Sequence, residues 1–165
     1  RFYNLDGRSY ARNIQLEASC VFFESLDVRG AWRWTDARTT YNGQLMEKPL
    51  TSRYKGLITL GYRTPFYRWQ FDATAQFNGP GTLPTPDAKT PLWEKTFEAY
   101  TLVGAQITKR FKKLSLYVGV ENLFDFTQPH PIVASSDPWG DDFDATMVWG
   151  PVHGRKIYGG LRWNL

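Results

Sequence analysis

The sequence has 165 residues, a length typical of a single domain. It is 42% hydrophobic and 16% aromatic, with a net charge of +4. No stretch approaches the roughly 18 consecutive apolar residues of a membrane-spanning helix, and the aromatic content argues against a disordered chain. A single cysteine, Cys20, excludes an internal disulfide. The positive charges are scattered apart from the run at 109–113, which favours solvated faces over a nucleic-acid site.

Apolar and polar residues alternate with a period of two along most of the chain, which is typical of strands with one apolar and one polar face. In chain order, this pattern predicts strands at about 13–22, 28–35, 54–63, 68–77, 98–109, 114–122 and 155–165. The clearest segment is 68–77, where Trp69, Phe71, Ala73, Ala75 and Phe77 alternate with Arg68, Gln70, Asp72, Thr74 and Gln76. No segment has a helical period with caps, so we expect an all-β fold.

The connections between these strands alternate between short and long. Short turns are expected at 24–27, 64–66 and 110–113, and long polar connections at 39–53, 78–97 and 123–154. All the short turns would then lie at one end of an antiparallel up-and-down meander and all the long ones at the other. This arrangement is typical of a transmembrane β-barrel. We therefore expect about seven to eight strands that form part of a large transmembrane β-barrel.

Aromatic residues near the ends of the predicted strands suit the two interfaces of a membrane. These residues are Trp32, Trp34, Tyr62, Trp69, Tyr100, Trp149 and Trp163. We expect seven residues to face lipid: Trp69, Phe71, Phe77, Ile157, Leu161, Trp163 and Leu165. The core of a soluble sandwich would also explain the rings, but not an opposite face of mixed Arg, Gln, Thr, Asp and Gly.

The strand count bears on closure. An up-and-down bacterial barrel closes with an even number of strands, whereas about seven are predicted, with residues 1–4 as a possible remnant of an eighth. We therefore expect a segment of a larger barrel, open at 13–22 and at 155–165. Hydrogen bonds between these two strands would instead indicate a complete eight-stranded barrel.

The last third of the chain resembles a known family. Val120-Glu121-Asn122-Leu123-Phe124-Asp125 resembles the strand-end motif near the C-terminus of TonB-dependent outer-membrane receptors, and residues 149–163 resemble their final strand. Residues 32–38 resemble the end of an earlier strand in the same family. The family usually ends in an aromatic residue, whereas this chain ends in Leu165 with Trp163 two positions earlier.

The resemblance implies the C-terminal portion of a β-barrel of about twenty-two strands in a bacterial outer membrane. Its long loops would be extracellular and its C-terminus periplasmic. Such a receptor imports a scarce nutrient, for example a ferric siderophore or cobalamin. Its partners would be outer-membrane lipid, the plug and remaining barrel strands that this sequence lacks, and the TonB energising complex, reached through an absent N-terminal segment.

The sequence contains none of the common nucleophile, nucleotide-binding or zinc motifs. We therefore expect no enzyme and no cofactor, and binding is the more natural role. Candidate ligand contacts are the loop aromatics Tyr41, Trp93 and Trp139 and the interior residues Arg29, Arg33, Arg68 and Asp72. For the arginines, a structural ladder along the interior is the favoured interpretation. Glu17 and Glu121 are expected on the wet face.

Two further clusters of side chains have both a structural and a functional interpretation. His130 and His153 lie in the same long connection and could bind a metal, but structural histidines are favoured. Asp137, Asp141, Asp142 and Asp144 could bind a hard cation through oxygen ligands, but their spacing is irregular and a solvated loop is favoured. Two alternatives to a receptor segment stay open: a complete small outer-membrane barrel with a structural or adhesive role, and a soluble all-β ligand-binding module.

Overall fold

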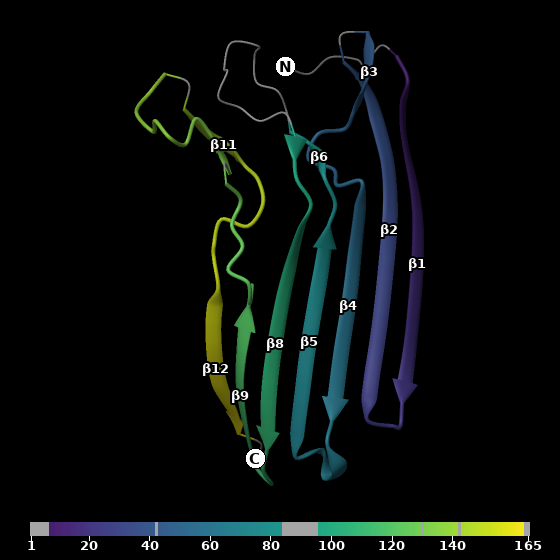
Figure 1. Ribbon diagram of the computed structural model, residues 1–165, viewed down its shortest axis with the longest axis vertical. Coiled ribbons are helices and arrows are strands. Elements are labelled where there is room, and N and C mark those ends of the chain that lie inside the picture. Colours follow the sequence, from purple (N-terminus) through teal and green to yellow (C-terminus); the bar gives the residue numbers. More distant parts are fainter. Residues whose placement is uncertain (1–6, 42, 84–95, 130, 142, 164–165) are drawn as a thin grey trace.

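The computed structural model describes residues 7–41, 43–83, 96–129, 131–141 and 143–163 (Figure 1). Seven long strands form one antiparallel sheet in the order β1-β2-β4-β5-β8-β9-β12. Their bounds are β1 Ser9–Phe22, β2 Leu26–Tyr41, β4 Tyr54–Arg63, β5 Trp69–Asn78, β8 Tyr100–Arg110, β9 Leu114–Glu121 and β12 Lys156–Trp163. The predicted all-β meander is thus confirmed, and every predicted strand is present.

Short elements occupy the connections. They are β3 Gln44–Glu47, β6 Gly81–Thr82, β7 Thr96–Phe97, β10 Ile132–Val133, β11 Asp144–Val148 and a 3-10 turn, η1, at Pro65–Tyr67. The pairs β6–β7 and β10–β11 form separate two-stranded ribbons, whereas β3 pairs with β2 as the eighth strand of the main sheet. The tight turns lie at one end of the sheet and the long connections at the other (Figure 1).

The first two strands are longer than the sequence pattern predicts, and the connection at 39–53 is partly strand. The β1–β2 ladder continues to Ser9 opposite Thr39, and Thr39 is also opposite Met46 of β3. The alternation of apolar and polar residues has stopped in these parts of β1 and β2, but the strands remain paired through their backbones. The predicted strand remnant at 1–4 lies outside the described residues.

The strand register keeps apolar residues together across the whole sheet. One row runs Cys20–Val28–Leu60–Ala73–Ala105–Val120–Ile157, with one residue from each of the seven long strands. Residues directly opposite each other share a face, so the period of two makes one face apolar through the middle of the sheet. The opposite face carries the alternate, mostly polar residues.

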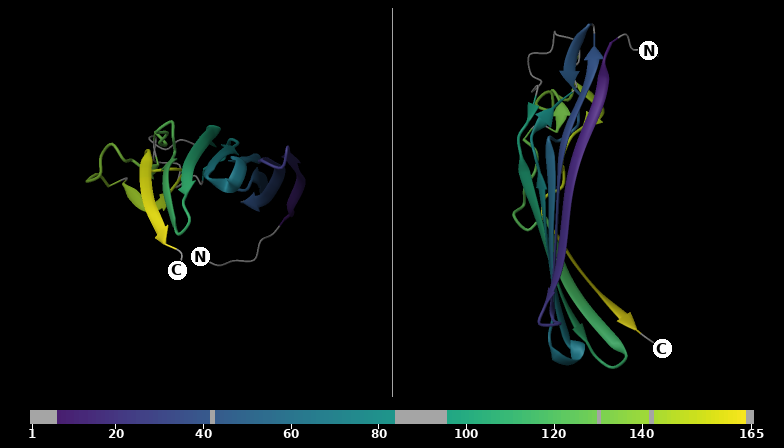
Figure 2. Two further views of the ribbon diagram at one scale, coloured as in Figure 1. Left: turned by 90° about the horizontal axis from the view of Figure 1, so that it is seen from below. Right: turned by 90° about the vertical axis from the view of Figure 1, so that its right-hand side faces the viewer.

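The sheet is curved and open. Seen along the strands, it forms an arc in which β1 and β12 bend toward the same side (Figure 2). Within the described part of the chain, β1 pairs with β2 alone and β12 with β9 alone. The hydrogen bonds between β1 and β12 that would mark a closed small barrel are therefore not formed.

The described residues have almost no interior. The buried hydrophobic side chains among them are Leu83, Phe97 and Ala134, all in the connections. The chain exposes 12643 Å², whereas a compact monomer of 19.1 kDa exposes about 8,400 Å². The single sheet therefore leaves most of both faces uncovered.

Candidate functional site

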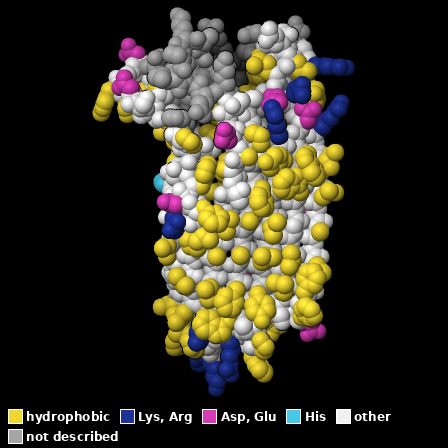
Figure 3. Space-filling model, viewed as in Figure 1, with side chains coloured by type: hydrophobic (Ala, Val, Ile, Leu, Met, Phe, Trp, Pro, Cys, Tyr) yellow, Lys and Arg dark blue, Asp and Glu magenta, His cyan; other side chains and the backbone are white. Residues whose placement is uncertain are grey.

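The apolar face of the sheet is a continuous uncharged band (Figure 3). The band is built from rows such as Ala18–Gly30–Ile58–Ala75–Val103, which contain only small or aliphatic side chains. Many of its larger members are exposed, from 40% for Phe71 to 76% for Ile157. Figure 2 shows that the arc bends away from the face seen in Figure 3, so the apolar band lies on the outer, convex side.

Aromatic rings border this band at both ends. Near the long connections, the Trp32 ring lies 5.1 Å from Tyr54, 5.9 Å from Trp34 and 6.1 Å from Phe77, measured between centroids. Near the tight turns, Phe71 lies 6.2 Å from Tyr62 and 6.3 Å from Trp69.

The distance between these two aromatic rows suits a membrane. Trp69 and Phe77 are eight residues apart on β5, which is about 26 Å along an extended strand. At the tilt of about 40° usual in barrels, this leaves about 20 Å along the membrane normal, close to the apolar band of about 25 Å in transmembrane barrels.

Two of the aromatic residues expected at the membrane interfaces do not belong to these rows. Tyr100 is opposite Asn78 on the polar face and stacks on Phe126 at 5.2 Å. Trp149 follows β11 and packs against Phe97 at 4.3 Å, so it belongs to the small core of the long connections. Alternation alone could not place them, because both lie where the regular strands begin or end.

The concave face carries a cleft of about 660 Å³ between the sheet and the segment 150–154. Strand residues from β5, β8 and β12 line its floor, including Asp72, Gln106 and Tyr158. The Tyr158 hydroxyl donates a hydrogen bond of 3.1 Å to Oε1 of Gln106. Asp72 in turn accepts hydrogen bonds of 2.9 Å from Nε2 of Gln70. The cleft is therefore lined by both polar and apolar residues, and it includes two carboxylates, those of Asp72 and Glu121.

The motif at 122–125 closes the base of the long connection that leads from β9 to β12. Nδ2 of Asn122 donates to the carbonyl oxygens of Phe126 at 2.7 Å and His153 at 3.2 Å, and Oδ1 accepts from the Phe126 amide at 3.0 Å. Oδ1 of Asp125 accepts from the Arg155 amide at 2.6 Å. The Asn122 and Asp125 side chains thus tie the start of the connection to its end.

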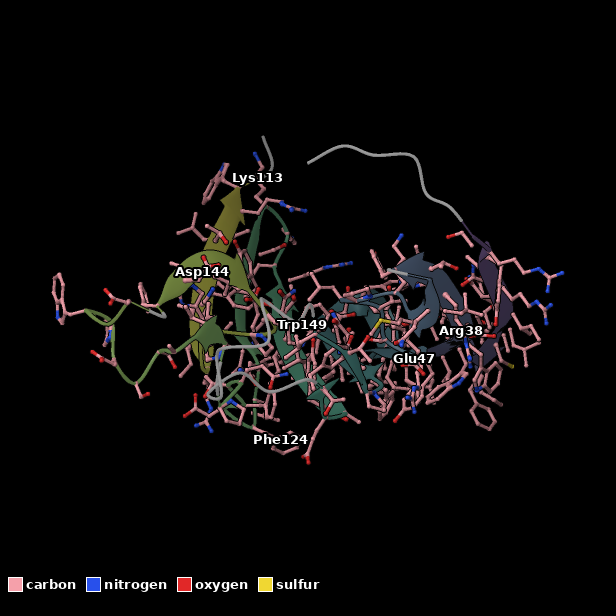
Figure 4. All side chains as sticks on the ribbon, turned by 90° about the horizontal axis from the view of Figure 1, so that it is seen from above. Arg38, Glu47, Lys113, Phe124, Asp144 and Trp149 are labelled. Atoms are coloured by element: carbon pink, nitrogen blue, oxygen red, sulfur yellow. The ribbon has the colours of Figure 1, made fainter. Side chains whose placement is uncertain are left out.

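Backbone conformation explains why Asn and Asp occupy this motif. Asn122 has φ 50° and Asp125 has φ 59°, a left-handed conformation that Asn and Asp tolerate better than most residues. Phe124, between them, is 68% exposed and points away from the sheet (Figure 4). The role of the motif visible in this structure is architectural.

The predicted ligand contacts do not form one site. Arg29 and Arg33 lie on the polar face of β2, whereas Arg68 lies in the tight turn before β5, at the opposite end from the long connections. Only Asp72 lines the cleft. Tyr41 ends β2 beside β3, and Trp139 is 96% exposed in the loop on the β12 side of the sheet (Figure 1). Trp93 lies outside the described residues.

The predicted lipid-facing residues share one face. Trp69, Phe71 and Phe77 are on the apolar side of β5, and Ile157, Leu161 and Trp163 are on the same side of β12. Leu165 lies outside the described residues. Glu17 and Glu121 lie on the polar face, opposite Ala31 and Lys156 respectively.

Sequence reasoning missed most of the cleft. Gln106 and Tyr158 alternate onto the polar face like many other residues, and nothing in their local sequence distinguishes them. They are 52 positions apart and are brought together by the β8–β9–β12 order of the sheet.

Neither candidate metal cluster gains support. Among the described residues, no group of three or more His, Cys, Asp or Glu side chains could hold a metal ion. His130 and Asp142 lie outside them. Asp144 has a different role, because Oδ1 accepts a hydrogen bond of 2.8 Å from the Thr146 amide.

The sequence matches no known protein-family model and, at a significant level, no curated protein. None of the helices formed by the described residues has the length and apolar character needed to span a membrane.

Proposed function

We propose that this chain forms part of the wall of an outer-membrane β-barrel, with its convex face toward lipid and its concave face toward a wet interior. One observation carries the proposal: an uncharged band, seven strands wide, lies on the convex face, and aromatic residues of β2, β4 and β5 border it at both ends. The polar opposite face matches the apolar-out, polar-in alternation of such barrels.

Strand lengths fit the same environment. The strands β4, β5 and β8 have 10, 10 and 11 residues, and a tilted strand of about 9–11 residues crosses the bilayer core. Within the sheet, ladder hydrogen bonds satisfy the backbone, as a hydrocarbon environment requires. Among the seven long strands, β1 and β12 each have a described strand partner on one side alone, and their outer edges are the positions where further barrel strands would join.

The finer proposal is that this wall belongs to a TonB-dependent receptor that imports a scarce nutrient such as a ferric siderophore or cobalamin. Support comes from the resemblance of residues 32–38, 120–125 and 149–163 to that family. The clamp formed by Asn122 and Asp125 gives the family-like motif a defined task at the base of an outer loop.

A soluble ligand-binding module is the competing proposal, and membrane partition separates the two. The chain is unfolded in urea and diluted into buffer, into detergent micelles or into phosphatidylcholine vesicles. We expect strand content and a blue-shifted tryptophan spectrum only with micelles or vesicles, and quenching of this emission by lipids brominated in their acyl chains. A monomer that folds in plain buffer and does not bind to vesicles would overturn the proposal.

Transport is tested separately from membrane placement. Ferric siderophores and cobalamin are titrated onto the membrane-inserted full-length receptor, with Asp72→Asn in the cleft and Asp27→Asn, near the tight turns, as a matched control. We expect the cleft variant alone to change affinity. Equal behaviour of both variants would remove the cleft from the ligand path while leaving the barrel proposal intact.

A further inference from the structure

Positive charge is concentrated at the tight-turn end of the sheet, just beyond the apolar band. The cations at this end are Arg63, Arg68, Lys109, Arg110, Lys112, Lys113 and Arg162. The turn between β1 and β2 contributes two acidic residues, Glu24 and Asp27, and Asp27 pairs with Arg29 at 3.1 Å. In Figure 3 the end of the molecule below the band is accordingly blue, with little magenta.

At the opposite end of the sheet, carboxylates pair with two of the cations. There Arg38 pairs with Asp36 at 3.1 Å and Arg53 with Glu47 at 2.9 Å. Figure 4 shows Arg38 and Glu47 close together at this end. Among the described residues, none of the seven tight-turn cations forms an ion pair with a carboxylate. The net positive charge at the tight-turn end is therefore available to an external anion.

Lys109 connects this charge to the apolar band. Its register partners Trp69 and Leu116 lie on the convex face, so Lys109 is the cationic member of an otherwise apolar row. Its ammonium lies 4.4 Å from the centre of the Trp69 ring and 5.5 Å from that of Phe111. A long side chain that rests on rings while its charge points to water is typical of residues at a membrane interface.

We infer that the tight-turn end binds the phosphodiester headgroups of anionic phospholipids through Lys109, Lys112, Lys113 and Arg68. The inference rests on the proposed membrane placement. Lipid is favoured over an acidic protein because the cations adjoin the aromatic row and the exposed apolar band, which a lipid covers with its headgroup and acyl chains together. Lys112 and Lys113, at the tip of the β8–β9 turn, extend the charge past the rings into the headgroup layer.

The experiment measures lipid preference in the membrane-inserted chain. The chain is reconstituted into vesicles of phosphatidylcholine alone or with roughly 30% phosphatidylglycerol, which gives an anionic surface that attracts basic segments. The lipids released with the protein are counted by native mass spectrometry. The test variant is Lys112→Gln/Lys113→Gln. The matched control is Arg38→Gln/Arg53→Gln, which removes the same charge from the ion-paired end.

We expect phosphatidylglycerol to be enriched on the native chain and on the control, and the enrichment to fall by roughly tenfold or more in the test variant, since each cation near a charged surface contributes about fivefold. Raising the salt from 0.1 M to about 1 M should weaken it, because the screening length shortens to about 3 Å. Equal losses in the two variants, or no enrichment in a chain that has inserted, overturn the inference but leave the barrel proposal standing.

Two further outcomes are informative. Failure of the native chain to insert into either vesicle would overturn the proposed function itself. Displacement of phosphatidylglycerol by soluble poly-glutamate, with tighter binding of the polymer than of the lipid, would assign the surface to an acidic protein and overturn the lipid inference.

Discussion

At the scale of single residues, neighbouring positions on β5 have opposite environments. Ala73 lies in the middle of the apolar band, opposite Leu60 and Ala105, whereas Thr74 lies on the polar face opposite Thr59 and Gly104. Ala73 and Thr74 are adjacent in the sequence, but their side chains lie on opposite faces of the sheet.

This contrast predicts unequal costs for the same substitution. Ala73→Arg should reduce the stability of the membrane-inserted chain by ~2–4 kcal/mol, because it places a charge near the bilayer midplane. Thr74→Arg should cost far less, since its charge reaches the wet side. Urea unfolding of the two variants from lipid vesicles measures the difference, and equal costs would contradict the assignment of the faces.

Asn122 predicts a second effect at this scale. Replacing it with Ala removes three hydrogen bonds and leaves a less tolerant residue in a left-handed conformation. We expect a loss of about 1–3 kcal/mol and faster proteolytic cleavage within 123–154. Asn122→Asp keeps the acceptor atom for the Phe126 amide and should be cut more slowly than Asn122→Ala. Identical cleavage of the native chain and both variants would show that the clamp does not hold the connection.

At the scale of elements, the pairing of β9 with β12 depends on rings that lie over glycines. Tyr158 is opposite Gly119 and Tyr117 is opposite Gly160. A Cβ atom added at Gly119 would overlap the Tyr158 ring, whereas one added at Gly30 on β2 would meet no atom within 4 Å.

The two glycines therefore predict opposite responses to alanine. Gly119→Ala should destabilise the β9–β12 pair by about 1–3 kcal/mol through overpacking, and should disturb the hydrogen bond from Tyr158 to Gln106. Gly30→Ala should be neutral or slightly stabilising, since alanine reduces the freedom of the unfolded chain. Denaturant midpoints compare the two, and a Gly119→Ala variant as stable as Gly30→Ala would refute this account of the packing.

The β10–β11 ribbon should respond to acid. The hydrogen bond from the Thr146 side chain lowers the pKa of the Asp144 carboxyl below its ordinary value of 3.8, and the hydrogen bond from the Thr146 backbone amide lowers it further by a smaller amount. Because the folded-state pKa is depressed, the stabilisation is present above about pH 4 and is lost as the pH falls through the lowered pKa. The NMR resonance of the Thr146 amide should follow this titration between about pH 5 and about pH 2. Asp144→Asn should abolish the pH dependence of that resonance.

At the scale of the whole molecule, the open edges of the sheet predict uneven hydrogen exchange. Amides of β4 and β5 are enclosed by strands on both sides, whereas β1 and β12 each have one strand partner. In the isolated chain in micelles, we expect slow exchange in β4 and β5 and fast exchange of the outward-pointing amides of β1 and β12. Full protection of both edge strands in a monomer would indicate that the barrel had closed on itself, and protection only in a dimer would indicate edge-to-edge pairing.

The local alternation of the sequence determined a large part of this architecture. Apolar residues two positions apart predict which residues share a face without reference to any partner strand, and the faces of 13–22, 68–77 and 114–122 are found as predicted. Turn residues likewise predicted which connections are short. Both signals are carried within a few residues of the chain, so they can be read without the fold.

Other features depended on pairing between distant segments and were decided by the tertiary structure. The extension of β2 to Tyr41 relies on ladder bonds to β1 and β3, the cleft joins Gln106 to Tyr158, and Trp149 is placed by contact with Phe97. The same holds for the open edges and the curvature, which follow from the order and twist of all seven strands. A period of two records only which side a residue faces, because it contains no information about what lies across the sheet.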